Sequence, residues 1–72
     1  MPHISVTMHP GRTPEQKEAL AGALKRALTD SLGCPEGVVS VSVAEVPPEK
    51  WQEHLKSFPE ESMLILPDKK KD

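Results

Sequence analysis

The second residue of this 72-residue chain carries the clearest chemical signal in the sequence. Removal of Met1 would leave Pro2 with a free secondary amine, which is a good base and nucleophile when it is unprotonated. Burial in an apolar pocket would lower the pKa of the Pro2 amine because the charged form loses hydration, and the nearby cation Arg12 would act in the same direction. A base tuned close to ambient pH suits proton abstraction next to a carbonyl group.

Other familiar catalytic sets are missing from the sequence. It contains no glycine-rich phosphate loop, no nucleophile elbow and no metal-ligand spacing, so we expect no metal site. Cys34 could in principle pair with His3 or His54 as nucleophile and base. Nothing in the sequence places either histidine beside Cys34, which lies in the turn that follows a long helical segment.

The spacing of apolar residues predicts the elements that would position Pro2. Residues 3–8 and 38–46 alternate apolar and polar side chains and predict two strands. Residues 14–32 predict an amphipathic helix, which begins at a Thr13 and Gln16 capping box and ends at Gly33. The apolar stripe of this helix consists of Leu20, Leu24, Ala27, Leu28 and Leu32.

The remaining third of the chain predicts shorter elements. Residues 48–56 read as one or two helical turns, on which Trp51 and Leu55 share a face. Residues 62–66 are interpreted as a short strand that packs on a neighbour. We expect residues 68–72, with their three lysines, to form a flexible, solvated tail.

A strand, a long helix and a second strand define a β-α-β unit of the α+β class with parallel strands and a right-handed crossover. We expect residues 1–72 to form a single domain. So short a domain buries little apolar surface, and the single cysteine allows no internal disulfide, so we expect stability to come from oligomerisation. Pairing with a second copy would extend the two-stranded sheet, and an unpaired thiol is typical of a reducing compartment, here the cytoplasm.

Charge and hydropathy argue against two classes of partner. The formal net charge is −2, from 9 basic and 11 acidic residues, which gives no basic footprint for nucleic acid. No apolar run approaches the length of about 20 residues that a membrane span needs, and no signal peptide is visible. We therefore expect neither a nucleic acid nor a membrane as partner.

Several short motifs, taken together in order and spacing, resemble the 4-oxalocrotonate tautomerase superfamily. The resemblance runs without a gap from Pro2 to Trp51, and the segment around Trp51 is similar to PptA-type tautomerases. The residues that carry it are Met1-Pro2-His3-Ile4, then Gly11-Arg12-Thr13 with Gln16-Lys17, then the valine-rich strand ending in Glu45-Val46, then Pro48-Glu49-Lys50-Trp51-Gln52.

The resemblance implies a MIF-like tautomerase unit and a catalytic role for Pro2 as general base. It implies an enol–keto tautomerase that uses no cofactor and acts on small 2-hydroxy-dienoate or enolpyruvate carboxylates. Arg12 would bind the substrate carboxylate and Trp51 would keep the pocket apolar. The sheet would be extended by dimerisation, with a homodimer favoured over a hexamer because the family's glycine-rich C-terminal hairpin is missing.

One position departs from the family pattern and leaves other functions open. Many members carry an arginine at the position of Ser40, and a neutral serine there favours a monocarboxylate such as phenylenolpyruvate over 4-oxalocrotonate. Ser40 is nevertheless interpreted as a residue that lines the substrate site. The alternatives are a ligand-binding homologue that has lost activity, and a hydratase or dehalogenase in which protonated Pro2 is the acid.

Overall fold

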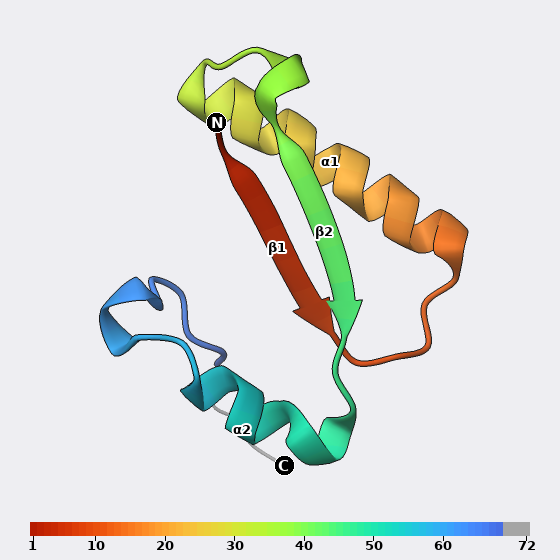
Figure 1. Cartoon of the computed structure of the whole chain (residues 1–72), viewed down its shortest axis with the longest axis vertical. Coiled ribbons are helices and arrows are strands. Elements are labelled where there is room, and N and C mark those ends of the chain that lie inside the picture. The colour runs from red at the N-terminus through yellow and green to blue at the C-terminus, as the bar shows by residue number, and fades with distance from the viewer. Residues whose placement is uncertain (69–72) are drawn as a thin grey trace.

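The computed structural model describes residues 1–68 and contains one β-α-β unit followed by a short second helix (Figure 1). The elements, in chain order, are β1 (His3–Met8), α1 (Pro14–Leu32), β2 (Ser40–Glu45) and α2 (Trp51–Lys56). β1 and β2 pair in parallel, with His3 opposite Ser40 and Met8 opposite Glu45. The predicted fold is therefore confirmed, whereas the predicted tail at 68–72 lies outside the described residues apart from Asp68.

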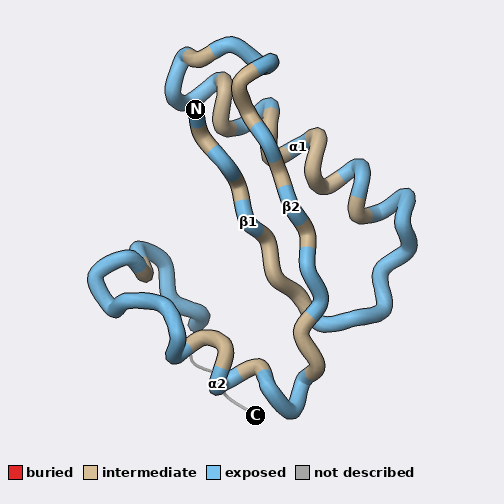
Figure 2. Tube along the Cα trace, viewed as in Figure 1, coloured by how far each residue is buried: buried red, intermediate tan, exposed pale blue. Residues whose placement is uncertain are grey.

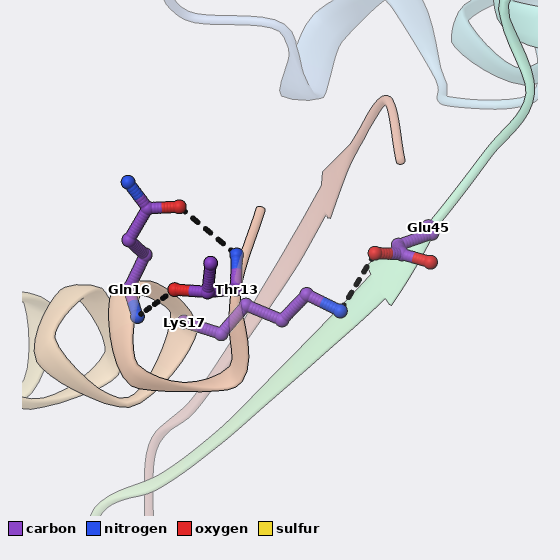
Figure 3. Close-up of polar contacts among 4 residues, drawn as sticks. All are labelled: Thr13, Gln16, Lys17 and Glu45. Atoms are coloured by element: carbon purple, nitrogen blue, oxygen red, sulfur yellow. Dashed lines mark hydrogen bonds and ion pairs between the residues drawn. The ribbon is translucent and has the colours of Figure 1, made fainter. Parts of the chain in front are cut away.

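The two ends of α1 are closed by the residues that the sequence indicated. Thr13 Oγ1 accepts a hydrogen bond from the Gln16 backbone N–H at 3.1 Å, and Gln16 Oε1 accepts one from the Thr13 N–H at 2.9 Å (Figure 3). At the other end Gly33 adopts a left-handed conformation with φ 73°, which lets its N–H donate to the Thr29 carbonyl oxygen at 2.8 Å. α1 thus begins and ends within the predicted range 14–32.

One ion pair fixes the start of α1 over the end of β2. Lys17 Nζ lies 2.6 Å from Glu45 Oε2, as Figure 3 shows. Because both side chains keep about a third of their surface exposed, the pair contributes roughly 0–1 kcal/mol. Glu45 shares its strand face with Val41 and Val43, so this contact identifies the sheet face that α1 covers.

The apolar side chains on the α1 side of the sheet are only half-buried. They include Ile4, Val6, Val41 and Val43, and Figure 2 shows no fully buried residue in the described part of the chain. The chain exposes 6061 Å², whereas a folded monomer of 7.9 kDa exposes roughly 4,400 Å². The excess is about twice the 800 Å² that one partner buries in a standard interface.

Two expectations from the sequence are corrected in detail. β2 begins at Ser40 rather than 38, because Glu36–Val38 form a 3₁₀ turn and the Val39 N–H bonds back to Glu36. The strand expected at 62–66 is wrong, since Glu60–Ser62 form another 3₁₀ turn and residues 63–66 have no strand to pair with in the described chain. Leu64 and Ile65 remain 89% and 88% exposed.

The apolar stripe of α1 is also only partly buried within one chain. Leu20, Leu24 and Leu28 are half-buried, whereas Ala27 and Leu32 are exposed. A side chain such as Leu32 gains burial only if another surface covers it. Together with the exposed segment 64–66, this leaves apolar surface at both ends of the fold without cover from the described chain.

The capping box makes a direct prediction about the stability of α1. Substitution Thr13→Ala removes the acceptor for the Gln16 N–H and is expected to lower the free energy of unfolding by about 1 kcal/mol. Urea denaturation followed by circular dichroism measures this change, with Glu18→Ala on the exposed side of α1 as the matched control. An unfolding midpoint equal to that of the control would contradict the role of Thr13.

Candidate functional site

Pro2 lies half-buried at the amino end of β1. Its carbonyl oxygen accepts a hydrogen bond from the Ser40 backbone N–H at 3.2 Å, which fixes the backbone of Pro2 against the start of β2. Met1 precedes it and is fully exposed, with a relative accessibility of 103%. The structure therefore holds Pro2 beside Ser40 while leaving the Met1–Pro2 bond next to an accessible terminal residue.

A cavity lies at the opposite end of the sheet from Pro2. It has a volume of about 630 Å³ and is lined by residues 7–12 and Trp51. The loop that follows β1 contributes Arg12, and the first residue of α2 contributes Trp51. A cation and a large apolar ring lining one cavity can bind a carboxylate together with an apolar tail.

A row of rings fixes Trp51 in this cavity. The ring centroids of His9 and Trp51 are 4.8 Å apart at an interplanar angle of 85°, which is an edge-to-face contact. On its other side Trp51 lies 5.7 Å from the His54 ring, and His54 lies 5.1 Å from the Phe58 ring. The part-buried His54 Nε2 lies 2.9 Å from Thr7 Oγ1, so this row joins α2 to β1.

Sequence reasoning considered His54 only as a possible base for Cys34 and missed the place of His9 and His54 around Trp51. A signal for His54 was present, because residues three apart on a helix share a face, as Trp51 and His54 do. His9 continues the alternation of β1 beyond its last residue and so follows Thr7 onto the same side of the sheet. No comparable spacing connects His9 to Trp51, which is distant in sequence.

The four predicted site residues therefore form two pairs rather than one site. Pro2 and Ser40 lie at the amino ends of the strands, and Arg12 and Trp51 lie beyond the carboxyl ends. Six residues of β1 separate the pairs, a distance of about 20 Å. One chain brings Arg12 to Trp51 but does not bring either of them to Pro2.

Within residues 1–68, no three side chains of His, Cys, Asp or Glu are grouped so that they could hold a metal ion. Neither α1 nor α2, the helices of the described chain, combines the length and apolarity that crossing a membrane requires.

The family model described as "Tautomerase enzyme" matches residues 2–65, so that the match begins at Pro2. A probable tautomerase of Ralstonia nicotianae is 47% identical over 51 residues, which cover 71% of this chain and 73% of the relative. The 2-hydroxymuconate tautomerase of Comamonas testosteroni is 39% identical over 51 residues, which cover 71% of this chain and 81% of that protein. The tautomerase PptA of Klebsiella pneumoniae is 40% identical over 53 residues, which cover 72% of this chain and 71% of PptA.

Solved structures support the same relationship. TomN, described as a 4-oxalocrotonate tautomerase homologue in the tomaymycin biosynthetic pathway, superposes with a TM-score of 0.66 at 46% identity, over 69% of this chain and 77% of TomN. A heterohexameric 4-oxalocrotonate tautomerase from Chloroflexus aurantiacus superposes with a TM-score of 0.67 at 39% identity, over 71% of this chain and 82% of that chain. The chain belongs to the 4-oxalocrotonate tautomerase family and is an isomerase of the tautomerase type.

The contact between His54 and Thr7 makes a prediction for the environment of Trp51. Substitution Thr7→Val keeps the side-chain shape but removes the hydroxyl, so α2 loses its hydrogen bond to β1 at a cost of about 1 kcal/mol. We expect the emission of Trp51, the single tryptophan, to shift to longer wavelength as water reaches the ring. Ser5→Ala, two residues earlier on the same strand face, is the control, and an unchanged Thr7→Val spectrum would contradict this role.

Proposed function

We propose that this protein is an enol–keto tautomerase in which the amine of Pro2, freed by removal of Met1, is the general base. The observation that carries the proposal is the family match starting at residue 2, together with the half-buried position of Pro2 at the head of β1. In the paired arrangement proposed below, burial of the Pro2 amine and the Arg12 guanidinium of a second copy would both disfavour the protonated form of the amine. The unpaired thiol of Cys34 is in keeping with a reducing compartment, which we take to be the cytoplasm.

The proposed reaction moves one proton and uses no cofactor. The Pro2 amine takes the proton from the 2-hydroxyl oxygen of the enol, and the electron pair of the broken O–H bond stays on that oxygen, which leaves an enolate. An oxygen electron pair then forms the C2=O double bond while the electron pair of the C2=C3 bond takes a proton from the Pro2 ammonium, which forms the C3–H bond. Pro2 is neutral again, and the product is the keto tautomer of the same molecule.

The substrate class follows from the charges available. Arg12 offers a guanidinium that can bind one carboxylate through two hydrogen bonds. Trp51 and the edge-on His9 ring offer apolar walls for an unsaturated or aromatic tail. Ser40 is neutral, so a second carboxylate would find no counter-ion there, and we propose an enolpyruvate monocarboxylate such as phenylenolpyruvate rather than 2-hydroxymuconate.

The distance between the two pairs of site residues supports assembly of the site from two copies. A two-fold axis perpendicular to the sheet reverses strand direction and keeps each face on its own side. Edge-to-edge pairing about such an axis extends the sheet and brings the carboxyl ends of one copy's strands to the amino ends of the other's. Pro2 of one copy would then meet Arg12 and Trp51 of a second copy, in a homodimer or in a hexamer built from such dimers.

The central prediction concerns Pro2. Substitution Pro2→Ala replaces the secondary amine with a weaker base in a different geometry and is expected to lower the rate of phenylenolpyruvate ketonisation at least a hundredfold. Ultraviolet absorbance of the enol follows the reaction, and Pro59→Ala, in an exposed turn, is the control. Intact mass determination on the same sample should give a chain without Met1. Unchanged turnover in Pro2→Ala, or full turnover by a chain that retains Met1, would refute the proposal.

A second prediction tests the shared site. Pro2→Ala and Arg12→Ala chains are each expected to be inactive alone, whereas their co-expression restores activity. Random pairing makes half of the dimers mixed, and each mixed dimer has one intact site of two, so about a quarter of wild-type activity is expected. Recovery at this level requires Pro2 and Arg12 to come from different copies. Absence of recovery in a sample that contains mixed dimers by mass spectrometry would place both residues in one chain.

A further inference from the structure

A polar cluster on the sheet face opposite α1 joins Ser40 to two residues that the reaction described above does not use, His3 and Ser42. The His3 ring bridges two serines of the neighbouring strand, with Nδ1 2.6 Å from Ser40 Oγ and Nε2 3.0 Å from Ser42 Oγ. The strand register explains the arrangement, since His3 pairs with Ser40 and Ser5 with Ser42 on the same face. Because both ring nitrogens have partners, the imidazole is held in one orientation.

The chemistry of imidazole determines how donors and acceptors are arranged in this cluster. A neutral ring has one donor nitrogen and one acceptor nitrogen, so one serine donates to His3 and the other accepts from it. If Ser42 donates to Nε2, the Nδ1–H donates to Ser40 Oγ and the Ser40 hydroxyl proton is free to point away from the sheet. In such a series of hydrogen bonds each bond polarises the next, which makes the Ser40 hydroxyl a stronger donor.

The position of the cluster relates it to Pro2 and to the ring-lined cavity. Ser40 is joined to Pro2 through its backbone N–H at 3.2 Å, so its hydroxyl lies at the same end of the sheet as Pro2. Thr7, which holds His54 of α2, shares the strand face of His3 by the alternation of β1. A two-fold axis perpendicular to the sheet preserves this face, so Trp51 of a second copy would lie on the same side as the cluster.

We propose that Ser40 donates a hydrogen bond to the C2 oxygen of the substrate and that His3 and Ser42 are positioning residues that hold its hydroxyl in the donating direction. The proposal rests on the proposed function, because the C2 oxygen gains negative charge when the enol loses its proton. A fixed donor aimed at that oxygen stabilises the charge as it develops. The ligand class is a 2-oxygenated carboxylate, bound by its oxygen at C2 rather than by a second carboxylate.

Kinetics separate this role from a structural one. His3→Leu removes both ring nitrogens at similar bulk and is expected to lower kcat about tenfold with little change in KM, because the affected interaction strengthens in the transition state. Ser42→Ala is expected to lower kcat in the same sense. His3→Gln, which keeps one donor and one acceptor, should recover most of the activity, and Ser5→Ala on the same face should match the wild type.

A binding measurement on the wild-type protein tests the contact without turnover. The probes are 3-phenyllactate, which carries an oxygen at C2 and cannot ketonise, and 3-phenylpropionate, which lacks that oxygen. We expect the ¹⁵N resonances of the His3 ring to shift with phenyllactate and to stay in place with phenylpropionate. The same shifts of the His3 resonances should occur in Pro2→Ala. The measurement therefore distinguishes loss of the general base from loss of the hydrogen bond between Ser40 and the C2 oxygen.

Three results would overturn the assignment. They are a His3 ring that responds equally to both probes or to neither, a kcat unchanged in both His3→Leu and Ser42→Ala, and a fall in Ser5→Ala as large as in Ser42→Ala. If His3→Leu fails to fold, the kinetics of Ser42→Ala and the spectra of the wild-type protein still decide the question.

Discussion

The length of β1 determines how far apart the candidate site residues of one chain lie. Six residues of parallel strand hold Pro2 at one end of the sheet and Arg12 with Trp51 about 20 Å away at the other. Neither loop is long enough to fold back over that distance, since α1 starts two residues after Arg12 and α2 starts at Trp51. In the proposed function, a chain of this topology cannot complete the site alone, so catalysis would require association with a second copy.

The same constraint accounts for the unfinished packing of the fold. α1 covers one face of a two-stranded sheet, and the structure leaves apolar side chains such as Leu32 and Leu64 in water. The surface that the chain exposes beyond the expectation for its mass is of the order that obligate partners bury. In the proposed assembly, burial of such residues against a second copy would link the stability of the fold to the site.

Much of the fold could be predicted because its signals are local. The alternation in β1, the Thr13 capping box and the Gly33 stop depend on neighbours in sequence, and each lies where it was expected. The strand expected at 62–66 failed because strand formation needs an edge to pair with, which apolar residues alone do not specify. The contacts of His3 with Ser40 and of His54 with Thr7 depend on register and helix placement, so no pattern in the sequence reveals them.

Whether the active species is a single chain or an assembly is tested most directly by active-enzyme sedimentation, in which the migrating species is detected by its own ketonisation of phenylenolpyruvate. If the site is shared between copies, turnover will sediment with a species of at least twice the 7.9 kDa mass of one chain, and no turnover will sediment with the single chain. Turnover that sediments with a species of 7.9 kDa would show that one chain holds a complete site and would contradict a site shared between two copies.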